Sequence, residues 1–370
     1  MRVVHVVGHL GVGGDSSAIF NVLLNKKDSS IKFDFITHPG YLEESVKWCK
    51  ELGSNVYILS GDVREQGLFR YYREIKSVLM KNGPFDAIHM HTSMQSGVGL
   101  LAAKKAGIKK RITHSHVTTI QRPASILKRI IAIPIFKFLI KNYATDYVAC
   151  GDAAGRYLFG RQADFDIVSN GIDSQSYMIR NNSNVNALRS EFSIGNNTIV
   201  VGHVGRLCKM KNQEFIIELA KIAKQMDLDV VFILVGEGED RGLIQNAISK
   251  YKLERFIKLV GRRSNIPDFM HLFNVFILPS LLGEGLPVTL IEAQAAGCFC
   301  IASDNVSKEA DIGLGIMKYN ELSNLNLWIK DIQTFWNSPR PSLERLQHAI
   351  RYNMLDRDSS TKKWLDLYKK

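Results

Sequence analysis

The sequence lacks any stretch of about 18 or more uncharged apolar residues, the length that a membrane-spanning helix requires. The longest apolar candidate, residues 125–141, is interrupted by Lys128, Arg129, Pro134 and Lys137. The sequence therefore predicts no transmembrane helix. The first residues, MRVVHVVGHLG, contain one basic residue and continue as a strand pattern, so no signal peptide is expected either.

Cysteine is scarce, and its spacing excludes the common metal and redox motifs. None of the five cysteines forms a C-x-x-C pair, although Cys298 and Cys300 lie two apart in a strand-like run and share one face. Packing is the favoured role for these thiols. A reduced cytoplasmic compartment fits this usage.

Acidic residues are under-represented in the first half of the chain. Residues 1–165 carry 23 Lys and Arg against 13 Asp and Glu, a net charge of +10, whereas residues 166–370 carry 25 against 23, or +2. A basic first half suggests an anionic partner, and nucleic acid, a phosphorylated substrate and an anionic membrane all satisfy this requirement. The alternative is an ordinary solvated surface.

Strand and helix patterns alternate twice along the 370 residues, which are too many for one ordinary core. Strands separated by helices of 10–15 residues indicate βαβ units and parallel sheets, so we predict an α/β protein with two doubly wound, Rossmann-like domains facing each other across a cleft. The predicted domains span residues 1–168 and 169–345, with the polar segment 180–186 just after the boundary and a helical tail at 346–370. The first series has strands at 2–8, 32–38, 56–60, 85–91, 110–116 and 146–151; the second has strands at 198–206, 229–238, 256–261, 275–280 and 298–303.

A glycine-rich loop, GHLGVGGDSS (8–17), follows the first strand. Its glycines let the backbone approach a ligand closely, and the next helix offers free N–H groups to an anion. The spacing does not match the dinucleotide pattern G-x-G-x-x-G. A tight strand-to-helix turn is the alternative reading.

Two basic residues, Arg206 and Lys211, follow the first strand of the second series in VGRLCKMKNQ (204–213). Two cations at the carboxyl end of a strand suit a diphosphate. A solvated basic loop is the alternative.

Two carboxylates, Glu284 and Glu292, flank the start of a helix in LPSLLGEGLPVTLIEA (278–293). Carboxylates repel a diphosphate but accept hydrogen bonds from hydroxyl groups, while the helix beginning near Pro287 offers N–H groups to a phosphate. Cations and carboxylates together suit a nucleoside diphosphate attached to a sugar. Alternatively, Glu284 caps the helix and Glu292 is a solvated helix residue.

These motifs together resemble the retaining, metal-independent sugar transferases with the GT-B fold, glycosyltransferase family 4. The resemblance covers about nine tenths of the chain. The residues of some of these motifs are similar to those of the bacterial branch of the family that builds capsular and exopolysaccharides. The segments that carry it are GHLGVGG, DAIHMH, RITHSH, ACGDAAGRYLFG, SNGID, VGRLCKMKN, LPSLLGEGLPVTLIEAQAAG and ASDNVSKEA.

On the donor side, the resemblance implies that Glu284 and Glu292 are the acids of the E-x7-E motif, at the donor sugar and the ribose. It places Arg206 and Lys211 on the diphosphate and assigns donor contacts to Gly13, Gly14, Gly285, Leu286, Pro287 and Val288. The first domain is then the acceptor side and the second the nucleotide-sugar side.

On the acceptor side, the resemblance implies that His116 faces the reacting sugar from the first domain and is catalytic with Glu284, Arg206 and Lys211. Acceptor-side candidates are Asp15, Ser16, His91 and His114, and Ser16 stands where many relatives have an acid.

The resemblance also implies that no metal and no cofactor is needed. Metal-dependent transferases use a D-x-D motif on a loop, whereas D-x-D occurs here at 164–166 and 227–229, each at the start of a predicted strand. The expected reaction is transfer of a sugar, with retention of configuration, from a UDP-linked donor to a glycan or lipid-diphosphate-linked acceptor.

The segment 123–144 is apolar with interspersed basic residues, a pattern that can lie on an anionic bilayer. We therefore expect peripheral association with the inner face of the cytoplasmic membrane. The alternative is a crossover helix buried against the sheet.

Three other functional classes remain open to test. They are a non-catalytic nucleotide-sugar-binding protein, a nucleotide-sugar epimerase or hydrolase on the same fold, and a nucleic-acid-binding protein. The last is disfavoured because the basic residues lack the interleaved aromatic residues of a strand-binding groove.

Overall fold

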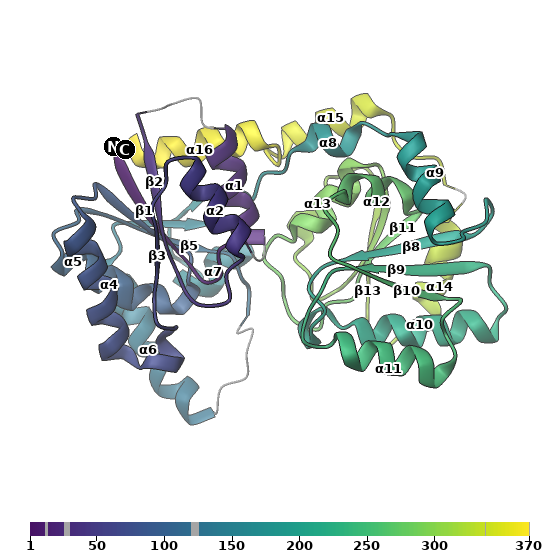
Figure 1. Ribbon diagram of the computed structural model, residues 1–370, viewed down its shortest axis with the longest axis horizontal. Helices are drawn as coiled ribbons and strands as arrows, with labels where there is room; N and C mark the ends of the chain where they lie inside the picture. The colour runs from purple at the N-terminus through teal and green to yellow at the C-terminus, as the bar shows by residue number, and fades with distance from the viewer. Residues whose placement is uncertain (12–13, 26–29, 120–125, 337, 370) are drawn as a thin grey trace. The chain divides into compact units, whose positions relative to one another are not determined.

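The computed structural model describes residues 1–11, 14–25, 30–119, 126–336 and 338–369. The chain divides into two compact units: Met1–Gly171 together with Arg357–Lys370, and Ile172–Asp356 (Figure 1). Each unit is a parallel sheet covered by helices, which is the α/β class predicted from the sequence.

The first unit contains a seven-stranded parallel sheet in the order β3-β2-β1-β4-β5-β6-β7. Its strands are β1 (Arg2–Val7), β2 (Lys32–Thr37), β3 (Val56–Ile58), β4 (Ala87–Met90), β5 (Lys110–Ser115), β6 (Asp146–Ala149) and β7 (Asp166–Ile167). Its described helices are α1 (Gly14–Asn25), α2 (Glu43–Glu51), α3 (Val63–Gln66), α4 (Leu68–Asn82), the 3-10 turn η1 (Ser93–Gln95), α5 (Ser96–Lys105), α6 (Ile126–Tyr143), α7 (Asp152–Phe159) and α16 (Arg357–Lys369).

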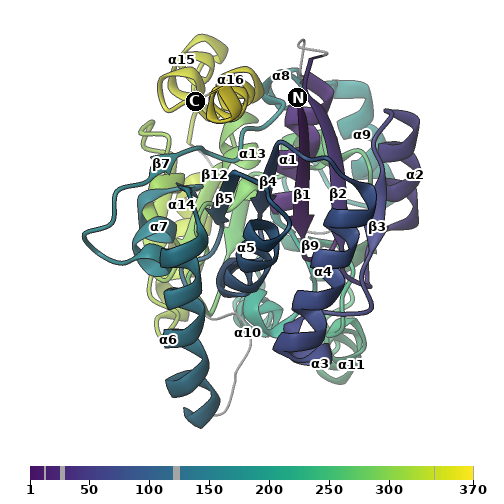
Figure 2. The ribbon, with the colours of Figure 1, turned by 90° about the vertical axis from the view of Figure 1, so that its left-hand side faces the viewer.

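The two faces of this sheet have separate cores, because successive strand residues point to opposite sides. Val3 and Phe33 pack with residues of α1, α2 and α16. Val4 and Ile88 pack with residues of α4, α5 and α6 on the other face, where Figure 2 shows these three helices side by side. The central strands are buried on both faces, and they are largely apolar apart from the histidines on the face beneath α16.

The second unit contains a six-stranded parallel sheet in the order β10-β9-β8-β11-β12-β13. Its strands are β8 (Ile199–Val204), β9 (Val230–Val235), β10 (Ile257–Gly261), β11 (Val275–Leu278), β12 (Phe299–Ser303) and β13 (Met317–Asn320). Its described helices are α8 (Ser174–Met178), α9 (Asn182–Glu191), the 3-10 turns η2 (Lys209–Lys211) and η3 (Lys308–Ala310), α10 (Gln213–Gln225), α11 (Arg241–Tyr251), α12 (Ile266–Leu272), α13 (Val288–Ala295), α14 (Leu325–Trp336) and α15 (Leu343–Tyr352).

The domain limits differ from the predicted ones at both crossings between the units. The first crossing follows Gly171 rather than residue 168, because the Ser169 and Gly171 carbonyls accept hydrogen bonds from Ser360 and Asn21 of the first unit, at 2.7 Å each. The predicted tail 346–370 is split: α15 belongs to the second unit, and α16 returns to the first.

Two regions that the sequence described only coarsely are defined by the structure. The polar segment 180–186 includes the start of α9, since Asn181 caps this helix by accepting hydrogen bonds from the Ser183 and Asn184 backbone N–H groups. After β12 the chain is mostly helical, and it also adds β13, which pairs with β12 at the edge of the sheet.

All five cysteines are buried and reduced, in agreement with the packing role predicted for them. Among the described helices, none combines the length and the apolar character needed to cross a bilayer.

Candidate donor site and a histidine cluster

Lys211 and Glu284 form an ion pair at the carboxyl edge of the second sheet. Lys211 lies in η2 after β8, and Glu284 lies in the loop after β11. The Lys211 ammonium donates to the Glu284 carboxylate at 2.6 Å, and the two side chains are only 14% and 11% exposed. The residues predicted on the diphosphate and on the donor sugar are therefore neighbours.

The loops after β8 and β11 are also joined by their backbones. Leu281 N donates to the Met210 carbonyl at 2.9 Å, and the Asn212 side chain donates to the Pro279 carbonyl at 3.0 Å. Ser280 donates to the second oxygen of Glu284. These bonds hold the ion pair in a fixed place beside α13.

A neutral histidine lies beneath the ion pair. The His203 ring bonds the Ile277 carbonyl and the Gln213 amide, both at 3.0 Å, and burial lowers the pKa of His203 to about 4, with Lys211 lowering it further. Because the amide donates to Nε2, the Nδ1–H donates to the carbonyl. Sequence reasoning missed this histidine, although it lies in the same strand that leads to Arg206.

Helix α13 begins without a side-chain cap. Its N-terminal cap is Pro287, and no side chain caps it, so the reading of Glu284 as a helix cap was wrong. Gly285, Leu286 and Pro287 are buried next to this helix start. A free helix N-terminus favours an anion such as phosphate.

Glu292 lies inside α13 and interacts with Tyr177 of α8. Burial raises the pKa of Glu292 to about 7, and the hydrogen bond from Tyr177 opposes this rise. A solvated helix glutamate would not be shifted in this way, so that alternative was wrong too. Sequence reasoning missed Tyr177, because it assigned no element to residues 174–179, where α8 lies.

Arg206 occupies a more exposed position than Lys211. Its guanidinium pairs with Glu239 at 2.9 Å, and both side chains are about half exposed. The loops after β8 and β9 touch closely here: Gly236 has φ +142°, and a Cβ on it would lie 1.9 Å from the Gly205 carbonyl oxygen. Only glycine fits at this contact.

The glycine-rich loop of the first unit is described only in part. Gly13 lies outside the described residues, α1 begins at Gly14, and the Asp15 side chain is not described. Ser16 is buried, and its hydroxyl donates to the His9 carbonyl at 3.1 Å. The contacts predicted for Gly13, Gly14 and Asp15 therefore stay predictions.

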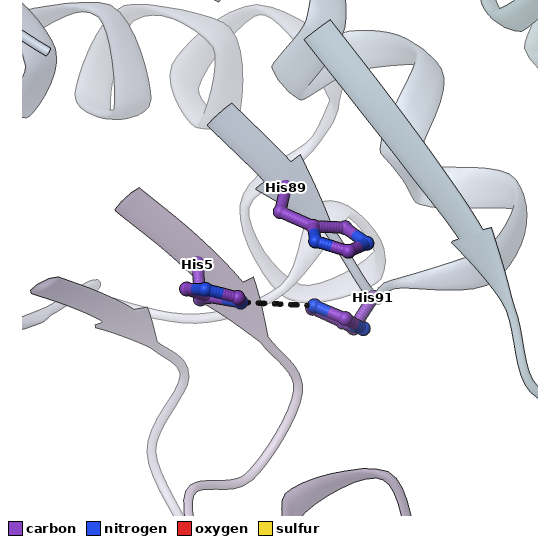
Figure 3. A group of neighbouring side chains, drawn as sticks. All are labelled: His5, His89 and His91. Carbon is purple, nitrogen blue, oxygen red and sulfur yellow. Dashed lines mark hydrogen bonds between the residues drawn. The ribbon is translucent and has the colours of Figure 1, made fainter. Parts of the chain in front are cut away.

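The first unit brings five histidines together on the sheet face beneath α16. They are His5 of β1, His89 of β4 with His91 directly after this strand, and His114 of β5 with His116 directly after it. His5 and His89 are paired in register, and Figure 3 shows the hydrogen bond of 3.2 Å that joins His5 to His91. His91 in turn bonds His116 at 2.9 Å.

Helix α16 closes this cluster with two aromatic residues. The Trp364 ring is stacked near His5 and His91, with centroids 5.7 and 5.5 Å away, and the Tyr368 hydroxyl bonds His89 at 2.7 Å. Spacing by two in HMH and HSH places each pair of histidines on one strand face. No comparable spacing predicts the contacts of Trp364 and Tyr368 with the histidines, because these two residues come from the other end of the chain.

Burial favours the uncharged form of four of these rings. It lowers the pKa values of His89, His91 and His114 well below the ordinary value, with neighbouring histidines adding to the effect, and it lowers that of His116 to about 4. The resemblance places His116 at the reacting sugar. In the structure its Nε2 bonds His91, and its Nδ1 is buried.

The D-x-D sequences lie where the sequence analysis expected them. Asp166 opens β7, and Asp229 immediately precedes β9 and accepts from the Thr198 hydroxyl. Both are at the amino ends of strands, and within the second unit Asp229 lies at the opposite end of the sheet from Lys211 and Glu284.

Comparison with known proteins identifies relatives along the whole chain. The family described as glycosyl transferases group 1 matches residues 184–312. The chain is 30% identical over 375 residues to the "Putative glycosyltransferase EpsF" of Bacillus subtilis, covering 99% of this chain and 96% of that protein. It is 27% identical over 311 residues to the UDP-Gal:alpha-D-GlcNAc-diphosphoundecaprenol alpha-1,3-galactosyltransferase of Escherichia coli, covering 78% and 77%.

Solved structures share the two-unit architecture. HepE of Anabaena in complex with UDP-glucose superposes with a TM-score of 0.77 at 18% identity, covering 99% of this chain and 98% of that one. WaaG, a glycosyltransferase involved in lipopolysaccharide biosynthesis, gives a TM-score of 0.73 at 14% identity, with 99% of both chains covered. At these identities the likeness concerns the fold alone.

Proposed function

Since the chain belongs to the glycosyl transferases group 1 family, we propose that it moves a sugar from a UDP-linked donor to a growing, lipid-linked unit of a cell-surface polysaccharide. Its two parallel-sheet Rossmann-like units have the GT-B fold predicted from the sequence. The galactosyltransferase relative is named for a diphosphoundecaprenol-linked acceptor, and another relative, CapH of Staphylococcus aureus, for capsular polysaccharide biosynthesis.

The observation that carries this proposal is the Lys211–Glu284 pair beside the uncapped start of α13. The ammonium and the N–H groups would bind the diphosphate, while Glu284 would accept from a sugar hydroxyl. Arg206 would add a second cation at the exposed edge. Glu292 would accept from the ribose.

In the proposed reaction the bond between the anomeric carbon and the diphosphate breaks. Negative charge develops on the leaving phosphate, where Lys211 and the helix N–H groups stabilise it. The leaving phosphate takes the proton of the attacking acceptor hydroxyl, the new bond forms on the same face, and configuration is retained. These side chains and N–H groups supply the positive charge, so we propose that no metal takes part at the donor.

We further propose that the protein lies peripherally on the inner face of the cytoplasmic membrane. One face of α6 is packed, since Ile140 is buried in the core. The other faces of α6 carry four large apolar side chains that are 41–64% exposed: Ile130, Ile131, Ile135 and Phe138. The exposed Lys137 and Lys141 lie among them, which suits an anionic bilayer.

Vesicle sedimentation tests the membrane part. The double variant Ile131→Glu with Phe138→Glu should lose binding to anionic vesicles, while Tyr352→Glu, at a side chain of the second unit that is 77% exposed, should keep it. If the unchanged protein fails to bind anionic vesicles at low salt, the membrane proposal is wrong.

A panel of nucleotide sugars, each with and without a chelator, tests the donor site. A donor at 100 times its dissociation constant should add about 2.7 kcal/mol to stability, and we expect UDP-sugars to do so with or without the chelator. If no nucleotide sugar stabilises the protein, the proposed donor site is wrong.

Product analysis with a lipid-diphosphate glycan separates the rival functions. Transfer predicts a lengthened acceptor. A hydrolase or epimerase would change the donor without acceptor, and a non-catalytic binding protein would be stabilised without any product.

A further inference from the structure

We propose that His91, His114 and His116 form a binding site for a zinc-class divalent ion in the first unit. Each residue offers one ring nitrogen, and the three nitrogens lie within 4.8 Å of one another. Neither Lys211 nor Glu284 belongs to this group, although it includes His116, which the resemblance places at the reacting sugar.

The distances are close to those of a metal site. Zinc binds imidazole nitrogen at about 2.0 Å, so two ligands of one tetrahedral ion lie about 3.3 Å apart. His91 Nδ1 and His116 Nε2 are 2.9 Å apart. A small rotation of either ring therefore admits an ion between them.

The unmet hydrogen-bonding needs of these rings support the same assignment. Within the described part of the chain, neither nitrogen of the fully buried His114 has a hydrogen-bond partner within 3.5 Å, and neither has Nδ1 of His116. Buried polar atoms are normally satisfied, and exceptions call for a water or an ion. An ion bound between His91 Nδ1 and His116 Nε2, with His114 as its third ligand, satisfies one nitrogen of His114.

The other nitrogens have neighbours suited to hold the rings in place. His91 Nε2 bonds His5 at 3.2 Å, and the Asn170 side chain and the Val168 backbone are near enough to raise the pKa values of His116 and His114. Metal-bound histidines usually direct their second nitrogen to such partners.

A second histidine group, His5, His89 and His91, is less suited to an ion. The His5–His91 bond and the bond of 2.7 Å between His89 Nδ1 and Tyr368 already engage these rings. Within the described residues, His89 Nε2 is their one nitrogen that is buried without a partner, against three such nitrogens on His114 and His116. All three rings are at most 5% exposed, whereas His116 is partly exposed and gives an ion access. His89 therefore serves as the matched control.

The test measures bound zinc by equilibrium dialysis and elemental analysis of the full chain without a histidine tag. We expect one ion per chain for the unchanged protein, loss of this ion in His114→Gln and in His116→Gln, and its retention in His89→Gln and in His348→Gln, a surface position on α15. Magnesium should not bind, because imidazole favours zinc and its neighbours over oxygen-preferring ions.

Cobalt provides a second readout that does not depend on activity. Co²⁺ bound to the unchanged protein should show the visible bands of a tetrahedral site, and His116→Gln should lose them. His116 is only partly buried, so this variant should fold even if His114→Gln does not. Absence of zinc binding, or equal binding by His116→Gln and the unchanged protein, would overturn the proposal. The donor panel above is a separate measurement, so failure of one does not decide the other.

Discussion

The histidine cluster of the first unit and the Lys211–Glu284 pair of the second place polar groups beside a parallel sheet in opposite ways. The histidines lie within the sheet face, neutral, stacked and covered by α16. Lys211 and Glu284 lie beyond the strand ends, charged and paired, with their loops joined to each other. One arrangement depends on burial, and the other on charge presented at an edge.

The largest expected effect tests the dependence of the cluster on burial. Trp364→Ala removes a fully buried ring that stacks over the histidines, and it should lower the free energy of unfolding by about 3–5 kcal/mol. Tyr352→Ala, at an exposed ring, should change it by less than about 0.5 kcal/mol. Urea unfolding measures both. A small loss in Trp364→Ala would mean that α16 contributes little to the first core.

The next largest expected effect tests whether the Lys211–Glu284 pair acts through its charge. Lys211→Met should lower turnover by about 10² to 10³, because one stabilising cation is lost at the leaving phosphate. Lys209→Met, an exposed lysine of the same 3-10 turn, should change turnover only slightly. Steady-state kinetics with a UDP-sugar compare the two.

Loss of Lys211 also leaves Glu284 unpaired, so the double variant Lys211→Met with Glu284→Gln provides the control for folding. Full activity in Lys211→Met would rule out its proposed role.

A smaller effect concerns the pH dependence of the second unit. If donor binding requires the ionised carboxylate of Glu292, its raised pKa of about 7 means that affinity for UDP-glucose should fall up to about tenfold for each pH unit below 7. Calorimetry of the unchanged protein and of Glu292→Gln measures this slope. An identical slope in the variant would assign it to another group.

The free protein should show the opposite dependence. The folded-state pKa lies above the ordinary value of 4.5, so between 4.5 and about 7 the folded state binds more protons than the unfolded state. This contribution to stability is present below 4.5 and is lost as the pH rises through about 7. Urea unfolding at several pH values should show it, and Glu292→Gln should abolish it.

The smallest effect separates the two predicted cations. Arg206 is half exposed and paired with Glu239, and such surface pairs contribute about 0–1 kcal/mol. Arg206→Ala should therefore lower turnover less than Lys211→Met does and should leave the unfolding free energy nearly unchanged. An effect as large as that of Lys211 would show that Arg206 moves onto the donor.

The difference between the two regions also decides what could be predicted from the sequence. Glu284 and Lys211 lie in loops that directly follow strands, so parallel-sheet topology brings their loops to one edge once the strands are recognised. The strand alternation and a helix beginning near Pro287 were also predicted from the sequence, whereas the absence of a side-chain cap on this helix was not. Ser280 and His203 needed only a closer reading of the same segments.

Only some contacts within the histidine cluster could be predicted from the sequence. Spacing by two placed His114 with His116 on one strand face, and the same spacing applies to His89 and His91. The order of β1, β4 and β5, which makes His5 their neighbour, is a property of the folded sheet. The positions of Trp364 and Tyr368 over the histidines could not be predicted from the sequence. Helical periodicity indicates that one face of α16 is buried, but it does not indicate which of the two units that face packs against.

The return of α16 to the first unit has a consequence for how the protein is made. The first unit is interrupted by residues 172–356, a span of 185 residues, before its last helix is synthesised. At about 5–20 residues per second a ribosome needs about 10–40 s to add that span. During this interval the aromatic cover over the histidines does not yet exist. The first domain to be translated is therefore the last to be completed, and a nascent chain stalled before residue 357 would expose that face to chaperones and proteases.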